Sequence, residues 1–332
     1  MRLLVLGGTL FLSRAVAAEA VARGHEVTCA ARGHSGAVPT GATHVVLDRA
    51  EPDWTALEGE WDAVVDVAGS PGWVRDALEH LAERVPHWVF VSSISVYADH
   101  ATLHGTPETL PLLDPVGDDV EQDTPEAYGG AKVACEQLVR QRASSSLVVR
   151  PGLIVGPGDP TGRFSYWPER LAEGGDVLAP DHPERDVQLI DVRDLATFLV
   201  DAAEQRLEGV LDVTGRVTAL GEVLEEVQRG VEGHGPGSRA TLFWAAPAFL
   251  RRHHVQPWSG PRSLPLWLPR EMSGMLTHDA SAAYDAGLRT RPVSETAADT
   301  LTWLRSEEGR VTVTGMTRAE EQELLDDWHT IQ

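Results

Sequence analysis

The chain has 332 residues, of which 42% are hydrophobic, so it is long enough for one large domain or two lobes. Fifty acidic residues against 28 basic ones give a formal net charge of −22, and such a field repels nucleic-acid backbones and anionic lipid heads. No stretch approaches the roughly 20 apolar residues that cross a bilayer. We therefore expect neither a nucleic-acid partner nor a membrane partner.

The predicted elements alternate between short apolar strands and amphipathic helices through the first half of the chain. Such alternation is typical of a parallel sheet with crossover helices, an α/β doubly wound (Rossmann) fold that places ligands at the carboxyl ends of its strands. The apolar first residues are better explained as a strand than as a signal peptide. Strands are expected at 2–6, 25–30, 43–47, 63–67, 87–92 and 146–150, and helices at 12–23, 73–84 and 128–142.

The composition changes after Pro151, where Pro, Gly and Trp become frequent and the predicted helices are shorter. We expect a smaller substrate-binding lobe there, with a Rossmann-like piece returning in between. An acidic, proline-rich loop is expected at 100–124. The predicted division is a cofactor-binding domain at 1–160 with 188–215, a substrate-binding lobe at 161–187 and 216–305, and a helical tail at 306–332.

A glycine-rich turn follows the first predicted strand, in Gly7-Gly8-Thr9-Leu10-Phe11-Leu12. Backbone N–H groups in such a turn, together with the N-terminus of the next helix, hold a pyrophosphate. Only the first glycine of a G-x-x-G-x-x-G spacing is present, because Leu10 and Ser13 occupy the other two places. A tight turn without a ligand is the alternative interpretation.

The end of the second predicted strand indicates which dinucleotide is bound. An NAD site there usually offers a carboxylate to the ribose hydroxyls, whereas this strand runs into Arg32. A guanidinium pairs well with the 2′-phosphate of NADP, so NADP is the predicted cofactor and NAD remains possible. Asp48, at the end of the third strand, suits a contact with the adenine amino group, although a solvated loop aspartate fits equally well.

The catalytic hypothesis starts from Lys132, the only lysine in a chain whose other basic side chains are all arginine. It lies four residues after Tyr128, so the phenol and the ammonium share one helix face. A cation beside a tyrosine stabilises the phenolate and lowers the pKa of the phenol, as a general acid/base requires. The run Ser92-Ser93-Ile94-Ser95 ends the fifth predicted strand and can supply a hydroxyl that orients a carbonyl oxygen.

With these motifs the chain resembles the extended short-chain dehydrogenase/reductases, the NAD-dependent epimerase/dehydratase-like family, in the branch whose first turn reads Gly-Gly-Thr-x-Phe-Leu. The resemblance covers roughly residues 1–305 and implies that Ser93 is the catalytic serine beside Tyr128 and Lys132. Apart from Arg32 and Asp48, the cofactor contacts that the glycine turn and the resemblance imply, besides Lys132, are Gly7, Gly8, Thr9, Leu10, Phe11, Leu12, Val67, Ala68, Gly69, Pro151, Gly152, Leu153 and Ile154.

Members of this family reduce, oxidise, epimerise or dehydrate. Family dehydratases carry an Asp-Glu pair where this chain has Ile94 and Ser95, which disfavours dehydration. The leading hypothesis is an NADP(H)-dependent reductase or dehydrogenase acting on the carbonyl or alcohol of a small molecule. A sugar-nucleotide epimerase with bound NAD(P) and a non-catalytic nucleotide-binding protein are the alternatives.

Three further expectations concern the environment of the protein. Cys29 and Cys135 are predicted as free thiols in the reducing cytoplasm. No metal site is predicted, because the His253-His254 pair has no Cys or acidic residue nearby at ligand spacing. The oligomeric state is expected to be a monomer or a homodimer. Aromatic residues of the second lobe, Phe164, Tyr166, Trp167, Trp258 and Trp267, are candidates for a substrate wall or for core packing.

Overall fold

The computed structural model describes residues 1–235, 239–306 and 313–331, and the chain folds into two compact units. Each unit has its own hydrophobic interior. Unit 1 comprises Met1–Leu153, Val192–Gly215 and His278–Arg289. Unit 2 comprises Ile154–Asp191, Arg216–Thr277 and Thr290–Gln332.

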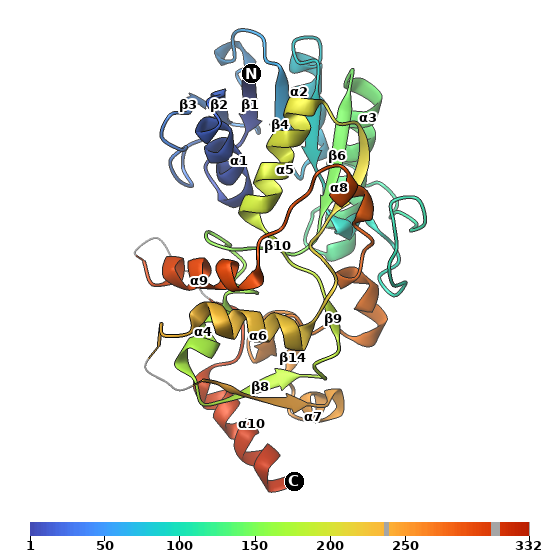
Figure 1. Ribbon diagram of the computed structural model, residues 1–332. Helices are drawn as coiled ribbons and strands as arrows, with labels where there is room; N and C mark the ends of the chain where they lie inside the picture. The colour runs from blue at the N-terminus through green and yellow to red at the C-terminus, as the bar shows by residue number, and fades with distance from the viewer. Residues whose placement is uncertain (236–238, 307–312, 332) are drawn as a thin grey trace. The chain divides into compact units, whose positions relative to one another are not determined.

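A seven-stranded sheet in the order β11-β6-β5-β4-β1-β2-β3 forms the centre of unit 1 (Figure 1). Every neighbouring pair of strands is parallel, so all seven carboxyl ends lie along one edge. The predicted doubly wound Rossmann fold is confirmed. The strands are β1 (Arg2–Leu6), β2 (Glu26–Ala31), β3 (Thr43–Val46), β4 (Ala63–Asp66), β5 (Trp88–Val91), β6 (Ser146–Pro151) and β11 (Gly209–Val213).

Two pairs of helices flank this sheet. Helix α1 (Phe11–Ala22) packs against α5 (Val192–Gln205), and α2 (Pro71–Leu81) packs against α3 (Pro125–Arg142). Because crossovers are right-handed and leave β1 in opposite directions, the two pairs cover opposite faces. Unit 1 also holds the short helices η1 (Trp54–Ala56), η2 (Ile94–Val96) and α8 (Ser281–Asp285).

The sequence explains these elements locally. All four residues of β4 and all four of β5 are buried, as expected for central strands covered on both faces. Helix α3 begins three residues earlier than predicted because Thr124 caps it, accepting a hydrogen bond from the Ala127 N–H, and Pro125 occupies its first turn. The core between the sheet and this helix includes Phe90 and Val139.

Unit 2 is built around three mutually packed helices, α4, α6 and α9, and a parallel strand pair, β8 with β13. Phe164, Tyr166, Trp167 and Trp267 are all buried in its interior, so they pack as core residues. The elements are β7 (Ile154–Val155), α4 (Tyr166–Glu173), β8 (Asp176–Pro180), β9 (Asp186–Val187), β10 (Ile190–Asp191), β12 (Thr218–Ala219), α6 (Leu220–Val231), β13 (Thr241–Ala245), α7 (Pro247–Arg252), β14 (Gln256–Pro257), β15 (Ser263–Leu264), η3 (Arg270–Leu276), α9 (Val293–Leu304) and α10 (Arg318–Ile331).

The two units differ from the predicted division in three segments. Residues 154–160 and 188–191, which the sequence analysis placed in the cofactor-binding domain, belong to unit 2. His278–Arg289, which the sequence analysis placed in the second lobe, belongs to unit 1, where Ala283 and Leu288 are buried and α8 contacts β11. Of the predicted tail at 306–332, residues 307–312 and 332 lie outside the described residues. Among the described residues no helix is long and apolar enough to cross a membrane.

Candidate active site

The carboxyl edge of the unit 1 sheet gathers the predicted site residues. The glycine turn follows β1, Arg32 follows β2 and Ser93 follows β5, and these strands lie in one parallel sheet. The topological switch point lies between β1 and β4, where strand order reverses and doubly wound sheets bind their ligands. Gly152 and Leu153 come after β6 in unit 1, whereas Ile154 begins β7 in unit 2.

The glycine turn has the shape of a phosphate cradle. Gly7 and Gly8 have φ of 134° and 105°, and a Cβ on Gly8 would lie 2.4 Å from Cys29 Sγ, so no other residue fits there. Helix α1 starts at Phe11 without a side-chain cap and with no acidic residue in its first turn, which leaves its N-terminus suited to an anion. These features fit a dinucleotide pyrophosphate.

Ser13 closes this turn from inside the helix. Its Oγ accepts a hydrogen bond from the Gly8 N–H (3.0 Å) and donates one to the Leu10 carbonyl (2.9 Å). The Gly8 amide is therefore engaged, and the Gly7 amide donates to the Ala30 carbonyl (2.9 Å). The amides from Thr9 through the first turn of α1 would hold a phosphate. Leu10 is exposed with φ of −128°, so a side chain at the second glycine place causes no backbone strain.

The two residues predicted for the adenosine end have different surroundings. Arg32 is exposed just beyond β2, where its guanidinium is accessible to a ligand. Asp48 is also exposed, and its carboxylate accepts a hydrogen bond from the Ala50 N–H (3.0 Å), which forms a local turn. Asp48 therefore already has a structural role within its own loop.

Lys132 is buried, with 3% of its surface exposed, and it joins two strand ends. Its Nζ donates to the Ala68 carbonyl after β4 and to the Val91 carbonyl at the end of β5, both at 2.8 Å. Burial lowers the pKa of the ammonium below the ordinary lysine value. An ammonium has three donors, so one N–H remains for another acceptor.

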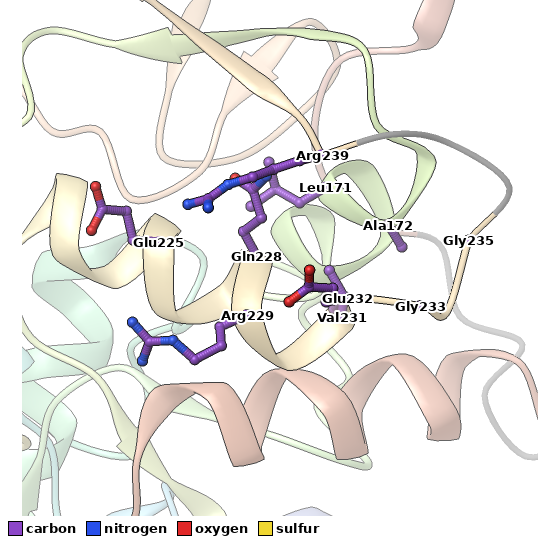
Figure 2. Close-up of a pocket in the computed structure, with 10 residues that line it drawn as sticks. All are labelled: Leu171, Ala172, Glu225, Gln228, Arg229, Val231, Glu232, Gly233, Gly235 and Arg239. Carbon is purple, nitrogen blue, oxygen red and sulfur yellow. The ribbon is translucent and has the colours of Figure 1, made fainter.

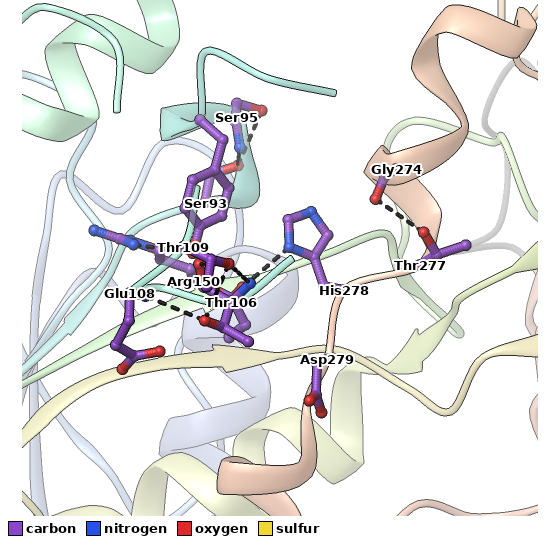
Figure 3. Close-up of polar contacts among 12 residues, drawn as sticks. Ser93, Ser95, Thr106, Glu108, Thr109, Arg150, Gly274, Thr277, His278 and Asp279 are labelled. Carbon is purple, nitrogen blue, oxygen red and sulfur yellow. Dashed lines mark hydrogen bonds and ion pairs between the residues drawn. The ribbon is translucent and has the colours of Figure 1, made fainter. Parts of the chain in front are cut away.

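Ser93 caps η2 directly after β5 (Figure 3). Its Oγ accepts a hydrogen bond from the Ser95 N–H and donates one to Ser95 Oγ, both at 3.1 Å. These bonds orient the hydroxyl at the carboxyl edge of the sheet, beyond the end of β5.

Helix α3, which carries Tyr128, approaches η2 closely. A Cβ on Gly129 would lie 2.1 Å from the Ser95 carbonyl oxygen, and one on Gly130 would lie 2.7 Å from the Asp114 carbonyl oxygen. Only glycines allow the first turns of the helix to pack against these backbones. Tyr128 therefore lies one residue from direct contact with η2, and Lys132 lies one helical turn further on.

Sequence reasoning missed the roles of Gly129, Gly130 and Ser13. The signal for the two glycines was present, because glycine inside a helix costs roughly 1 kcal/mol and a pair of them indicates a packing requirement. In the sequence Ser13 is only a departure from the glycine spacing, and no local pattern predicts its two hydrogen bonds with the turn.

A pocket of about 190 Å³ lies in unit 2, beside α4 and α6 (Figure 2). None of its lining residues is a predicted site residue, and it is smaller than the roughly 300–1,000 Å³ of typical ligand sites. Charged side chains of both signs line it, including Glu225, Arg229 and Arg239. We therefore do not assign the reaction to it. Among the described residues no group of three or more His, Cys, Asp or Glu side chains is placed to hold a metal.

The glycine turn, the parallel sheet and its strand order define the class of protein: a Rossmann-type dinucleotide-binding α/β protein. The chain belongs to the NAD dependent epimerase/dehydratase family, whose model matches residues 3–213. The predicted family is confirmed.

Two curated relatives and one solved structure show this similarity. The dTDP-6-deoxy-L-talose 4-dehydrogenase (NAD(P)(+)) of Kitasatospora kifunensis is 30% identical over 48% of this chain and 54% of its own length. The chloroplast stem-loop binding protein of 41 kDa b of Arabidopsis thaliana is 23% identical over 64% of this chain and 58% of its own length. The chain thus spans little more than half the length of either relative.

The Bordetella bronchiseptica enzyme WbmH, solved in complex with NAD+, has a TM-score of 0.60 and 17% identity, covering 92% of this chain and 99% of that chain. At this identity the similarity concerns the fold.

Proposed function

We propose that the protein is an NADP(H)-dependent reductase or dehydrogenase that acts on the carbonyl or alcohol of a small molecule. The observation that carries the proposal is the burial of Lys132, which lies on the same helix as Tyr128. Its ammonium is held by the carbonyl of Ala68, after β4, and by the carbonyl of Val91, at the end of β5. Burying an ammonium is costly, and a purely structural role is equally served by an apolar side chain. The only lysine of the chain therefore lies on the helix where a catalytic tyrosine would need a neighbouring cation.

Each of the three proposed catalytic residues has its own task. Tyr128 donates a proton to the carbonyl oxygen during reduction and removes it during oxidation. The Lys132 ammonium stabilises the phenolate form of Tyr128, and its remaining N–H binds a ribose hydroxyl of the cofactor. The Ser93 hydroxyl orients the reacting oxygen. The bound nicotinamide cofactor supplies or accepts the hydride.

The cofactor is proposed to lie along the carboxyl edge of the sheet. The turn at Gly7–Leu12 and the N-terminus of α1 hold the pyrophosphate, and Arg32 pairs with the 2′-phosphate of NADP. The segments after β4 and β6 (67–69 and 151–153, with Ile154 following) line the nicotinamide half. Asp48 is proposed for the adenine side.

Two alternatives remain for the same site. The family name favours an epimerase with tightly bound NAD(P), in which no net hydride is exchanged with solution. The name of the dehydrogenase relative favours the redox reaction instead. A non-catalytic nucleotide-binding protein is the other. An intact Ser93, Tyr128 and Lys132 set disfavours the second alternative, because a binding protein does not need all three.

The test is stoichiometric turnover. The purified chain is mixed with NADPH and a panel of carbonyl compounds that includes nucleotide-linked 4-keto-6-deoxy sugars, the class suggested by the relative's name. We expect one NADPH consumed per alcohol formed. Epimerised sugar nucleotide without net NADPH consumption would support the epimerase instead. Binding of NADPH without turnover of any compound in the panel would support the binding protein.

A further inference from the structure

The guanidinium of Arg150, on β6, is 2% exposed and divides its donors between two directions. Nε and Nη2 donate to Glu136 Oε1 (2.9 Å) and Oε2 (2.6 Å), a bidentate pair. Nη1 donates to the hydroxyl of Tyr97 (3.0 Å). A single buried side chain therefore connects helix α3 with the residue that ends η2.

These two sets of hydrogen bonds reach residues before and after Ser93 in the chain. On one side, Ser92 Oγ donates to Glu136 Oε1 (2.5 Å). On the other side, Tyr97 is the residue that ends η2, whose N-terminal cap is Ser93. The backbone at Ser93 is consequently tied before and after the serine, and both ties meet at Arg150.

The Tyr97 side is fixed further by a second pair of buried groups. The Tyr97 hydroxyl donates to Asp212 Oδ1 on β11 (2.6 Å), and Asp212 Oδ2 lies 3.0 Å from His278 Nδ1 (Figure 3). The ring of Tyr97 stacks on His278 with centroids 5.1 Å apart. Burial and the Asp212 charge raise the pKa of Tyr97, so its hydroxyl stays protonated as a donor.

We propose that this set of side chains, the Arg150 clamp, is a positioning device that sets the Ser93 hydroxyl relative to Tyr128 and Lys132. The clamp consists of Ser92, Tyr97, Glu136, Arg150, Asp212 and His278. The catalytic role of the clamp rests on the proposed function.

The clamp reaches the other catalytic groups through α3. Glu136 lies one helical turn after Lys132, so the carboxylate that holds Ser92 belongs to the helix that carries Lys132 and Tyr128. A buried ion pair adds little stability compared with apolar residues of the same volume. The buried polar side chains of the clamp are better explained by a need for fixed geometry at the site. A displacement of about 1 Å at a reacting group costs up to about 100-fold in rate.

Tyr97→Phe tests the clamp, since it keeps the ring and removes the hydroxyl that joins Arg150 and Asp212. We expect kcat for carbonyl reduction to fall by about tenfold or more while KM stays within about twofold. The matched control is Tyr166→Phe in unit 2. Tyr166 is buried as well, but its hydroxyl has no hydrogen-bond partner among the residues that the structure describes. The control should leave kcat unchanged.

A double-mutant cycle with Ser93→Ala separates positioning from general structure. If Tyr97 acts through Ser93, Tyr97→Phe causes no further loss of kcat in the Ser93→Ala background. Equal losses in both backgrounds would contradict the clamp. Ser92→Ala removes the hydrogen bond to Glu136 on the other side of Ser93 and leaves the Arg150–Glu136 pair intact. If Tyr97→Phe does not fold, Ser92→Ala replaces it, and we expect the same loss of kcat and the same absence of a further loss in the Ser93→Ala background.

Hydrogen exchange keeps the clamp testable without turnover. In Tyr97→Phe and in Ser92→Ala, the backbone amides of residues 92–97 should exchange faster than in the wild type. In Tyr166→Phe they should exchange at the wild-type rate. Unchanged exchange in Tyr97→Phe and Ser92→Ala would overturn the clamp whatever the activity. Faster exchange with an unchanged kcat would overturn its positioning role. A wild type that turns over no substrate would instead refute the proposed function, with the exchange result still deciding the clamp.

Discussion

At the scale of single residues, each place in the proposed site requires a particular kind of charged group. Lys132 and Arg32 are both basic, but one is buried against two carbonyl oxygens and the other is exposed at a strand end. A compact ammonium suits the first place and a planar, bidentate guanidinium suits the second. Their residue types were readable from the sequence, whereas the burial of Lys132 and its strand-end contacts were not.

Arg32→Ala tests the cofactor preference. Loss of a charge-assisted pair with the 2′-phosphate should weaken NADPH binding by about tenfold or more, because such bonds contribute about 1.5–3 kcal/mol, and it should change NADH binding little. Titration calorimetry with both cofactors measures this. Arg140→Ala, an exposed arginine on α3, removes the same charge away from the cofactor edge and serves as control. Equal weakening of both cofactors by Arg32→Ala would refute the NADP assignment.

The lowered pKa of Lys132 predicts a pH dependence of stability. In the window between the folded pKa and the ordinary value of 10.5, the unfolded chain binds more protons than the folded one, so stability rises with pH. Lys132→Met lacks this contribution. We therefore expect the melting temperature of the wild type minus that of Lys132→Met to increase as pH rises toward 10.5. A difference that is flat or shrinks with pH would show that the pKa of Lys132 is not lowered in the folded protein.

At the scale of elements, helix α3 carries two of the three proposed catalytic residues, Tyr128 and Lys132. The sequence predicted its existence and the face shared by Tyr128 and Lys132, because periodicity and spacing are local properties. The contact between Gly129 and the Ser95 carbonyl joins segments far apart in the sequence, so no local pattern could reveal it. The same holds for the Arg150 clamp, whose members come from separate strands, helices and loops.

Gly129→Ala tests this packing. Its Cβ has no room beside the Ser95 carbonyl, so the helix must shift, and we expect a loss of about 1–3 kcal/mol in unfolding free energy together with lower turnover. Gly72→Ala is the control, because the atoms nearest to a Cβ there belong to the exposed Asp118 carboxylate, a side chain that can shift more easily than a backbone, and alanine favours the helix. Chemical denaturation compares the two. Equal stability of both variants would contradict the close approach of α3.

At the scale of the whole molecule, the doubly wound parallel sheet could be predicted because alternating strands and helices allow few topologies. The family was predicted from the resemblance of its motifs. The second unit was less predictable. Its short strands carry weak periodicity, and the return of His278–Arg289 to unit 1 depends on non-local contacts. No motif in the sequence identifies the substrate class, so the substrate panel has to determine it.

The net charge of −22 gives a prediction for the molecule as a whole. Although one curated relative is a stem-loop binding protein, this chain should not bind an RNA stem-loop at physiological salt, because its field repels phosphates. An electrophoretic mobility assay with a hairpin RNA checks this. A shifted band at micromolar protein that weakens with added salt would contradict the expectation.

The most direct test of the central claim is Tyr128→Phe, which removes the proposed acid and keeps the ring. With NADPH and a carbonyl substrate from the panel, we expect kcat to fall by at least about 100-fold, the usual contribution of a positioned acid. The NADPH dissociation constant should stay nearly unchanged. A variant that keeps wild-type turnover would show that Tyr128 is not the proton donor and that the proposed Ser93–Tyr128–Lys132 mechanism is wrong.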